Sequence, residues 1–179
     1  RIRTQRFDPL TDFKLNVDAY RIHLKHKFDP ISVVAIGKID PLPHQIEAFV
    51  KMMAMLRPSS GISGRIRMLL ADDVGLGKTI MVGLVMKELL LRNHINRVLI
   101  ICPSGLQIQW REELKEKFNE EFTIIKGKIE GNPYKEKNRV IISVDIGRNE
   151  EKTKLLLDTK WDLIIFDEAH KLKPGNIRY

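Results

Sequence analysis

From residue 68 onward, short continuous apolar runs alternate with stretches in which apolar residues recur at helical spacing. The runs predict buried strands, and the spaced stretches predict amphipathic helices. Helices are expected at Lys78–Leu91 and Gln107–Phe118, and strands at Met68–Ala71, Val98–Cys102, Phe122–Ile125, Val140–Ile142 and Leu163–Phe166. Continuous apolar strands that alternate with helices are typical of a parallel sheet covered on both faces. We therefore expect an α/β fold with a mainly parallel sheet.

The flanking regions divide the chain into an appendage and a main domain. Residues 1–38 are predicted to be a partly helical appendage, and residues 39–179 to form the main domain. Within the domain, a helix is expected from about His44 to Leu56, followed by a loop over residues 57–64. Residues 126–139 are expected to form a basic connection whose charges face water, with a groove-facing role as the alternative.

Composition narrows the class of protein and its partners. The chain has 179 residues, 43% of them hydrophobic and 30% charged, which is typical of a soluble globular protein. Its net charge of +8 favours a polyanionic partner such as nucleic acid, although a basic surface can also serve solubility alone. Cys102 is the single cysteine, which indicates a reducing compartment. We expect a cytoplasmic location, associated with the nucleoid if the source is prokaryotic.

A glycine-rich segment lies between the first predicted strand and the next helix. Its residues are Asp72-Asp73-Val74-Gly75-Leu76-Gly77-Lys78-Thr79, with Ile80 behind them. In this context such a segment is typical of a loop that binds nucleotide phosphates, although an ordinary strand–turn–helix connection is the alternative. Backbone N–H groups and the helix N-terminus would surround the phosphates. Lys78 would neutralise the β- and γ-phosphates, and the Thr79 hydroxyl would bind magnesium.

A second acidic segment, Asp167-Glu168-Ala169-His170, directly follows the last predicted strand. Ligands of open parallel sheets bind at the carboxyl ends of the strands, so we expect Asp167 beside the magnesium bound by Thr79. Glu168 would then orient or deprotonate the attacking water. Taken alone, an acidic pair at this position also occurs as a simple helix cap.

Together these segments resemble the motifs of SWI/SNF-type ATPases in helicase superfamily 2. Residues 72–80 are similar to motif I, in which an Asp commonly begins the loop, and Asp-Glu-Ala-His is similar to motif II. Residues 97–114 look like motif Ia, residues 140–144 like the motif Ib region, and residues 42–48 like the adenine-reading glutamine motif, with Gln45 as its key residue. The resemblance runs from about residue 39 to 173, and Asp-Pro-Leu-Pro-His-Gln at residues 40–45 suggests the prokaryotic branch. It implies the first RecA-like lobe of a P-loop NTPase.

Several residues have both a functional and a structural interpretation. Ser104, Gly105 and Ser143 fall in motifs Ia and Ib, where backbone N–H groups could bind a nucleic-acid phosphate; a helix N-cap at Ser104 is the alternative. Trp110 and Trp161 are predicted to be core anchors rather than platforms for bases. For His170 the resemblance implies coupling of the γ-phosphate to a second lobe, against a simple hydrogen bond at a helix start.

The leading hypothesis is an ATP- and magnesium-dependent motor that moves along double-stranded DNA. The resemblance implies a second RecA-like lobe in the same polypeptide, which supplies arginine fingers. Because the Ser-Ala-Thr motif and that lobe do not appear before Tyr179, we expect efficient hydrolysis only in a longer parent protein. A true unwinding helicase, a restriction or defence motor, and a nucleotide- or DNA-binding module without turnover are the alternatives. A GTPase is disfavoured because no Asn-Lys-x-Asp motif is present.

Overall fold

The fold is built on a parallel sheet, described here from a computed structural model that covers residues 39–56, 67–73, 75–126 and 131–171. The predictions for the appendage at residues 1–38, for the loop at 57–64 and for Val74 lie outside these ranges. Four strands pair in the order β2-β3-β1-β4, and each pairing is parallel. Their bounds are β1 Val98–Cys102, β2 Thr123–Ile124, β3 Arg139–Ser143 and β4 Leu163–Phe166.

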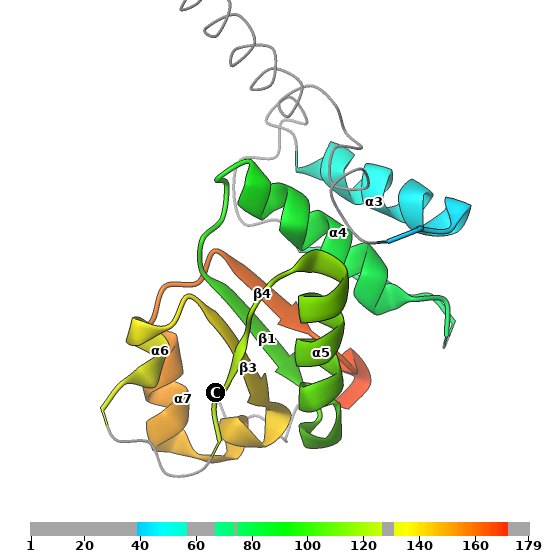
Figure 1. The fold of residues 1–179 in the computed structure, drawn as a ribbon. Coiled ribbons are helices and arrows are strands. Elements are labelled where there is room, and N and C mark those ends of the chain that lie inside the picture. The colour runs from blue at the N-terminus through cyan, green and yellow to red at the C-terminus, as the bar shows by residue number, and fades with distance from the viewer. Residues whose placement is uncertain (1–38, 57–66, 74, 127–130, 172–179) are drawn as a thin grey trace, which may run out of the picture.

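Helices cover both faces of this sheet (Figure 1). On one face lie α4 (Lys78–Leu91) and α5 (Gln107–Phe118), with α3 (Pro43–Met55) packed on α4. The short α6 (Pro133–Glu136) and α7 (Glu150–Leu157) lie on the other. Among the described residues, none of these helices has the length and apolar character needed to cross a membrane.

Alternate residues of β1 supply two separate cores. Val98, Ile100 and Cys102 pack with the apolar faces of α4 and α5, whereas Leu99 and Ile101 face α6 and α7. All five β1 residues are buried, because the strand has a neighbour on each edge and helices on each face. The sheet therefore depends on β1 as its central strand.

The close approach of α4 and α5 depends on a residue without a side chain. A Cβ atom at Gly83 would lie 2.3 Å from the Phe118 ring, which is closer than van der Waals contact allows. Phe118 is buried in the cluster that joins α4, α5 and β1. Gly83 thus sets the separation of the two helices on this face.

Most of the predicted elements are confirmed. The strands β1 and β4 and the helices α4 and α5 have the predicted bounds, and α3 begins and ends one residue earlier than expected. β2 is shorter than predicted by one residue at each end, and β3 is longer by one at each end. Residues 127–130 of the predicted basic connection lie outside the described ranges; of its other charged residues, Lys126, Lys135, Glu136 and Lys137 face water as predicted, whereas Arg139 is partly buried against Glu120. The connection also contains α6, whose Tyr134 is fully buried.

Trp161 packs as predicted, against the cluster between the sheet and α7. Its indole Nε1 donates to the Leu156 carbonyl at 3.3 Å, and the Arg97 guanidinium lies 5.1 Å from the ring centre. The same guanidinium donates to carbonyls of the α6 region, including that of Tyr134. Trp161 therefore has a packing role at the amino end of β4.

The prediction of a buried strand at Met68–Ala71 is wrong. The segment is assigned to no strand, and the side chains of Met68 and Leu69 are 40% and 81% exposed. Within the described residues β4 is the last strand of the sheet, and its Ile164 and Phe166 remain about half exposed. A short apolar run indicates burial but does not specify which strand edge it pairs with.

A buried ion cluster joins α4, β3 and the end of α5. The Glu120 side chain is 6% exposed, with its Oε1 2.6 Å from Lys87 Nζ on α4. Its Oε2 lies 2.5 Å from Arg139 Nη1 at the start of β3. Two cations thus compensate one desolvated carboxylate, which is the condition for a buried charge to be tolerated.

We predict that Glu120→Ala destabilises the fold, because it removes the shared partner of two partly buried cations. Loss of one member of a buried ion pair typically costs about 3–5 kcal/mol in the free energy of unfolding, and the partial exposure of Lys87 and Arg139 places this case near the lower end. Urea denaturation measures the effect. The control is Glu121→Ala, whose side chain is 78% exposed and should contribute less than about 1 kcal/mol. Equal stability of the two variants would contradict the prediction.

Candidate functional site

The glycine-rich segment leads into the N-terminus of α4 through a left-handed residue. Gly77 is the N-cap of α4 with φ 77°, and its carbonyl accepts the first helical hydrogen bond, from Ile80 N at 2.9 Å. A Cβ atom at Gly77 would lie 2.4 Å from Nε2 of Gln45. Both the backbone conformation and the close approach therefore require glycine here.

Lys78 folds back over the segment that precedes it. Its Nζ donates to the carbonyl oxygens of Asp72 at 2.8 Å and Asp73 at 2.9 Å. Both carbonyls are at the exposed surface, so this ammonium group is held by oxygens that a phosphate could replace. Thr79 is half-buried in the first turn of α4, and Ile80 packs against the core.

Gln45 joins α3 to the glycine-rich segment. It is 3% exposed; its Oε1 accepts from Leu42 N at 3.0 Å, and its Nε2 donates to the Leu76 carbonyl at 3.0 Å. The ring of His44 also lies 3.1 Å from the Leu76 carbonyl. In this structure Gln45 is thus a brace for the segment, and its adenine-reading role stays a prediction.

Asp167 is fixed by hydrogen bonds on three sides. Its backbone N donates to the Ile101 carbonyl at 2.9 Å, which continues the pairing of β4 with β1. Its Oδ1 accepts from Glu168 N at 2.8 Å, and its Oδ2 accepts from the Trp110 indole Nε1 at 2.8 Å. Trp110 is 6% exposed, so the prediction of a core anchor is confirmed, but no local pattern predicts its bond to Asp167.

Glu168 has an unusual backbone conformation. Its φ of 54° lies in the left-handed region, which is uncommon for a residue with a side chain. Its exposed carboxylate lies 3.1 Å, at Oε2, from Nδ1 of His170. Strained residues of this kind cluster at functional sites, which makes Glu168 a candidate on structural grounds as well.

Topology brings the two segments to one edge of the sheet. Only residues 92–97 link the end of α4 to the start of β1, so α4 must begin near the carboxyl end of β1. Because β4 is parallel to β1, Asp167 lies at that same edge. Figure 1 shows the arrowheads of β1 and β4 pointing to the side on which α4 begins.

The thiol of Cys102 lies at the end of β1, beneath this edge. Burial, with a smaller contribution from the negative charge of Asp167, raises the pKa of Cys102 to about 11. Since only the thiolate is a nucleophile or metal ligand, Cys102 stays protonated at neutral pH and packs as a small apolar residue. Its place in the core supports this reading.

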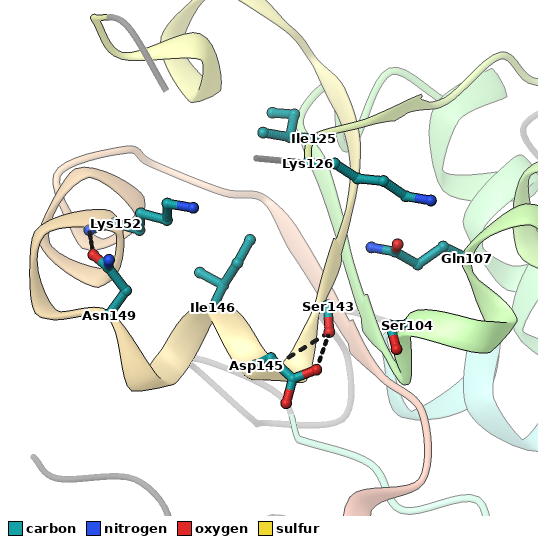
Figure 2. Close-up of a pocket in the computed structure, with 9 residues that line it drawn as sticks. All are labelled: Ser104, Gln107, Ile125, Lys126, Ser143, Asp145, Ile146, Asn149 and Lys152. Atoms are coloured by element: carbon teal, nitrogen blue, oxygen red, sulfur yellow. Dashed lines mark hydrogen bonds between the residues drawn. The ribbon is translucent and has the colours of Figure 1, made fainter. Parts of the chain in front are cut away.

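A pocket of about 340 Å³ opens along the same edge, at the ends of β1, β2 and β3 (Figure 2). Its lining comes from α5, α7 and the turns after the strands: Ser104, Gln107, Ile125, Lys126, Ser143, Asp145, Ile146, Asn149 and Lys152. The lining contains two lysines and one aspartate. The structure thus brings together Ser104 and Ser143 from two separate predicted motifs.

The two serines differ in what they offer to a ligand. Ser143 Oγ donates to Asp145 Oδ2 at 2.9 Å and accepts from Asp145 N at 3.2 Å, so its hydroxyl is engaged within its own turn. Ser104 and Gly105 are exposed in the 3₁₀ turn Ser104–Leu106. The alternative of a helix N-cap at Ser104 is wrong, because Leu106 precedes α5 and no side chain caps the helix.

Gln107 is a pocket residue that sequence reasoning missed. It is 1% exposed, and its Nε2 has no hydrogen-bond partner among the described residues. Figure 2 shows its amide pointing from α5 toward the strand ends, with Lys126 above it and Ser104 and Ser143 below. A buried amide donor without a partner costs free energy, so it marks a place where a ligand could supply the acceptor.

Comparisons with known proteins agree with this geometry. A Bacillus subtilis protein described as an uncharacterized ATP-dependent helicase, YqhH, is 36% identical over 140 residues, which are 77% of this chain and 23% of that protein. The RNA polymerase-associated protein RapA of Yersinia pseudotuberculosis is 36% identical over 139 residues, 73% of this chain and 14% of RapA. This chain therefore spans less than a quarter of the length of these relatives.

Solved structures support the fold class. The SWI2/SNF2 ATPase core of Sulfolobus solfataricus, solved in complex with dsDNA, superposes with a TM-score of 0.61 at 25% identity. The match covers 75% of this chain and 27% of the archaeal one. The RecA-like fold class is thus confirmed. A family model described as "Type III restriction enzyme, res subunit" matches residues 38–178, well over half of the sequence, and the chain therefore belongs to this ResIII family of helicase-related proteins.

Proposed function

We propose that this chain is the ATP-binding lobe of a SWI/SNF-type ATPase that moves along double-stranded DNA, and that it acts with a second RecA-like lobe of the same polypeptide. The observation that carries the proposal is the shared edge of the sheet. The N-terminus of α4 with Lys78, the Asp167-Glu168 pair and the pocket all lie at the carboxyl ends of parallel strands. Nucleotide and polymer would then bind to one rigid frame.

The residues present fit a nucleoside triphosphate. Gly77 presents the N-terminus of α4 with no side chain in the way, so its backbone N–H groups and helix dipole are available to an anion. The Lys78 ammonium group donates to two loop carbonyls, and in the complex it would donate to β- and γ-phosphate oxygens instead. Asp72 through Ile80 would form the cradle.

The residues also fit magnesium brought in with the nucleotide. Within the described ranges no cluster of three or more His, Cys, Asp or Glu side chains could hold a metal. Magnesium characteristically takes one or two protein ligands and completes its shell with phosphates and water. Asp167 and Thr79 would be those ligands, and the ion would supply charge neutralisation on the phosphates.

The roles of the remaining residues follow from their positions. Glu168, one residue beyond Asp167, would orient the attacking water and accept its proton. The His170 ring, 3.1 Å from that carboxylate, would restrict its rotation and would pass the state of the γ-phosphate to a second lobe. Gln45, whose side chain already joins α3 to the phosphate segment, would contact adenine.

The pocket would bind the phosphate backbone of the DNA. Ser104 and Ser143 line it, with Gly105 next to Ser104, and their backbone N–H groups would bind phosphate oxygens. Gln107 would add an amide donor, and Lys126 and Lys152 positive charge. Asp145 opposes an anion, so the lysines must outweigh it. Contacts to phosphates carry no sequence information, and we therefore expect binding without sequence preference.

We predict that Lys78→Ala weakens binding of magnesium-ATP by roughly 10- to 150-fold, the loss expected for hydrogen bonds to a charged group. Titration of a fluorescent ATP analogue into the natural polypeptide that contains this chain measures it. Lys115→Ala is the matched control, because Lys115 is exposed on α5 and pairs with Glu121 at the surface. Equal affinities of the Lys78 variant and the unmodified protein would contradict the assignment of a phosphate-binding loop.

We predict that Glu168→Gln lowers DNA-stimulated ATP turnover by about 100- to 10,000-fold while nucleotide affinity stays nearly unchanged. The amide preserves shape but cannot accept a proton. Asp167→Asn should behave differently and weaken magnesium-dependent nucleotide binding as well as turnover, because it alters a proposed metal ligand. Turnover and affinity are measured side by side for both variants. Near-normal turnover in Glu168→Gln would remove Glu168 from the mechanism.

We predict that Gln107→Leu weakens DNA binding by roughly tenfold without lowering the stability of the fold. A leucine of similar volume removes an amide donor that has no partner in the protein, so stability should be unchanged or higher. In the same assay Lys126→Ala should reduce the slope of log affinity against log salt by about one. Fluorescence anisotropy across a salt series measures both. Unaltered affinity and slope in these variants would place the DNA elsewhere.

A further inference from the structure

We propose that Trp110 is a positioning residue for the magnesium ligand: its indole N–H fixes the Asp167 carboxylate in the orientation from which the metal is bound. The inference rests on the proposed function, since it concerns the same metal site. The observation behind it is the 2.8 Å hydrogen bond from Trp110 Nε1 to Asp167 Oδ2, across 57 residues of sequence.

The bond leaves the carboxylate little freedom to rotate. Oδ1 accepts from the Glu168 backbone N at 2.8 Å, while Oδ2 accepts from the indole, so each oxygen has a protein donor. A carboxylate oxygen has two lone pairs, and one on each oxygen therefore remains for a metal or its water. Without the indole, only the local bond to the next residue would orient the group.

The donor itself is rigidly placed. Trp110 is 6% exposed and belongs to the core cluster with Leu114 and Phe118 along one side of α5. The backbone of Asp167 is anchored to Ile101 of β1. Donor and acceptor are thus attached to two packed elements, and the bond has little entropy left to lose when the metal arrives.

Metal sites generally depend on such outer partners. Residues that hydrogen-bond to a ligating carboxylate typically contribute 10- to 100-fold to metal affinity. A tryptophan offers one donor and no competing acceptor, so it cannot turn its other side to the carboxylate or bind the metal itself. Trp110 therefore orients Asp167 without entering the coordination shell.

The test measures magnesium dependence of nucleotide binding in the natural polypeptide that contains this chain. Binding of a fluorescent ADP analogue is recorded across a magnesium series and in EDTA, so the readout does not require turnover. For Trp110→Phe we expect a roughly tenfold higher magnesium concentration at half-saturation and unchanged affinity in EDTA. A second variant with benzothienylalanine at position 110, which replaces the N–H by sulfur and keeps the ring shape, should behave alike.

Trp161→Phe is the matched control, because its indole donates to the Leu156 carbonyl on the opposite face of the sheet. It should leave the magnesium dependence unchanged. An unchanged magnesium midpoint in both position-110 variants would overturn the inference, and so would a loss of affinity that is equal with and without magnesium, since that indicates packing alone. Absence of any magnesium effect in the unmodified protein would instead refute the proposed function.

Discussion

The parallel pairing of β1 with β3 and β4 is the constraint on which every candidate site depends. Parallel neighbours require a crossover between strands, and here each crossover ends at the amino edge of the sheet and leaves the carboxyl edge to turns. The 3₁₀ turns Ser104–Leu106, Val144–Arg148 and Ala169–Lys171 follow β1, β3 and β4 at that edge. Chemistry-bearing residues from distant parts of the sequence are gathered there because the strands run in one direction.

Local patterns predicted the elements that bury continuous apolar runs or one helix face. This is why α4, α5, β1 and β4 have the expected bounds. The helix α7 was missed because its polar first half hides the pattern, although Asn149 caps it and Glu150 and Glu151 favour its start. The run at Met68–Ala71 shows the opposite case: it is apolar, but it pairs with no strand of the described sheet, and composition alone does not make a strand.

The motif residues of the site were predictable, but their supporting contacts were not. The sequence motifs include Lys78, Asp167 and the glycines, and these residues could be predicted because each motif is a short local segment. The bond from Trp110 to Asp167 and the brace from Gln45 to Leu76 join residues 57 and 31 positions apart. Contacts at such separation are set by how helices pack on the sheet, and no local periodicity encodes them.

Buried polar side chains in the described structure show two kinds of behaviour. Glu120 is compensated by two cations and serves the fold. The Gln107 Nε2 and the Tyr134 hydroxyl have no hydrogen-bond partner within the described residues. Both groups are buried and lack a partner, but they differ in their surroundings. Gln107 lines the pocket. Tyr134 lies in the core beneath α6, where burial raises the pKa of its hydroxyl. Gln107 therefore has space beside it for an acceptor.

The helix α5 carries both Gln107 and Trp110, three residues apart and hence on one face. The first lines the pocket and the second donates to Asp167. A helix is stiff over a single turn, while Asp167 is held independently by its backbone bond to β1. Any ligand whose contacts shift α5 against β1 must therefore change the geometry of the indole and the carboxylate. If the proposed function holds, this single turn of helix and the indole–carboxylate hydrogen bond at its end connect the pocket to the proposed metal ligand.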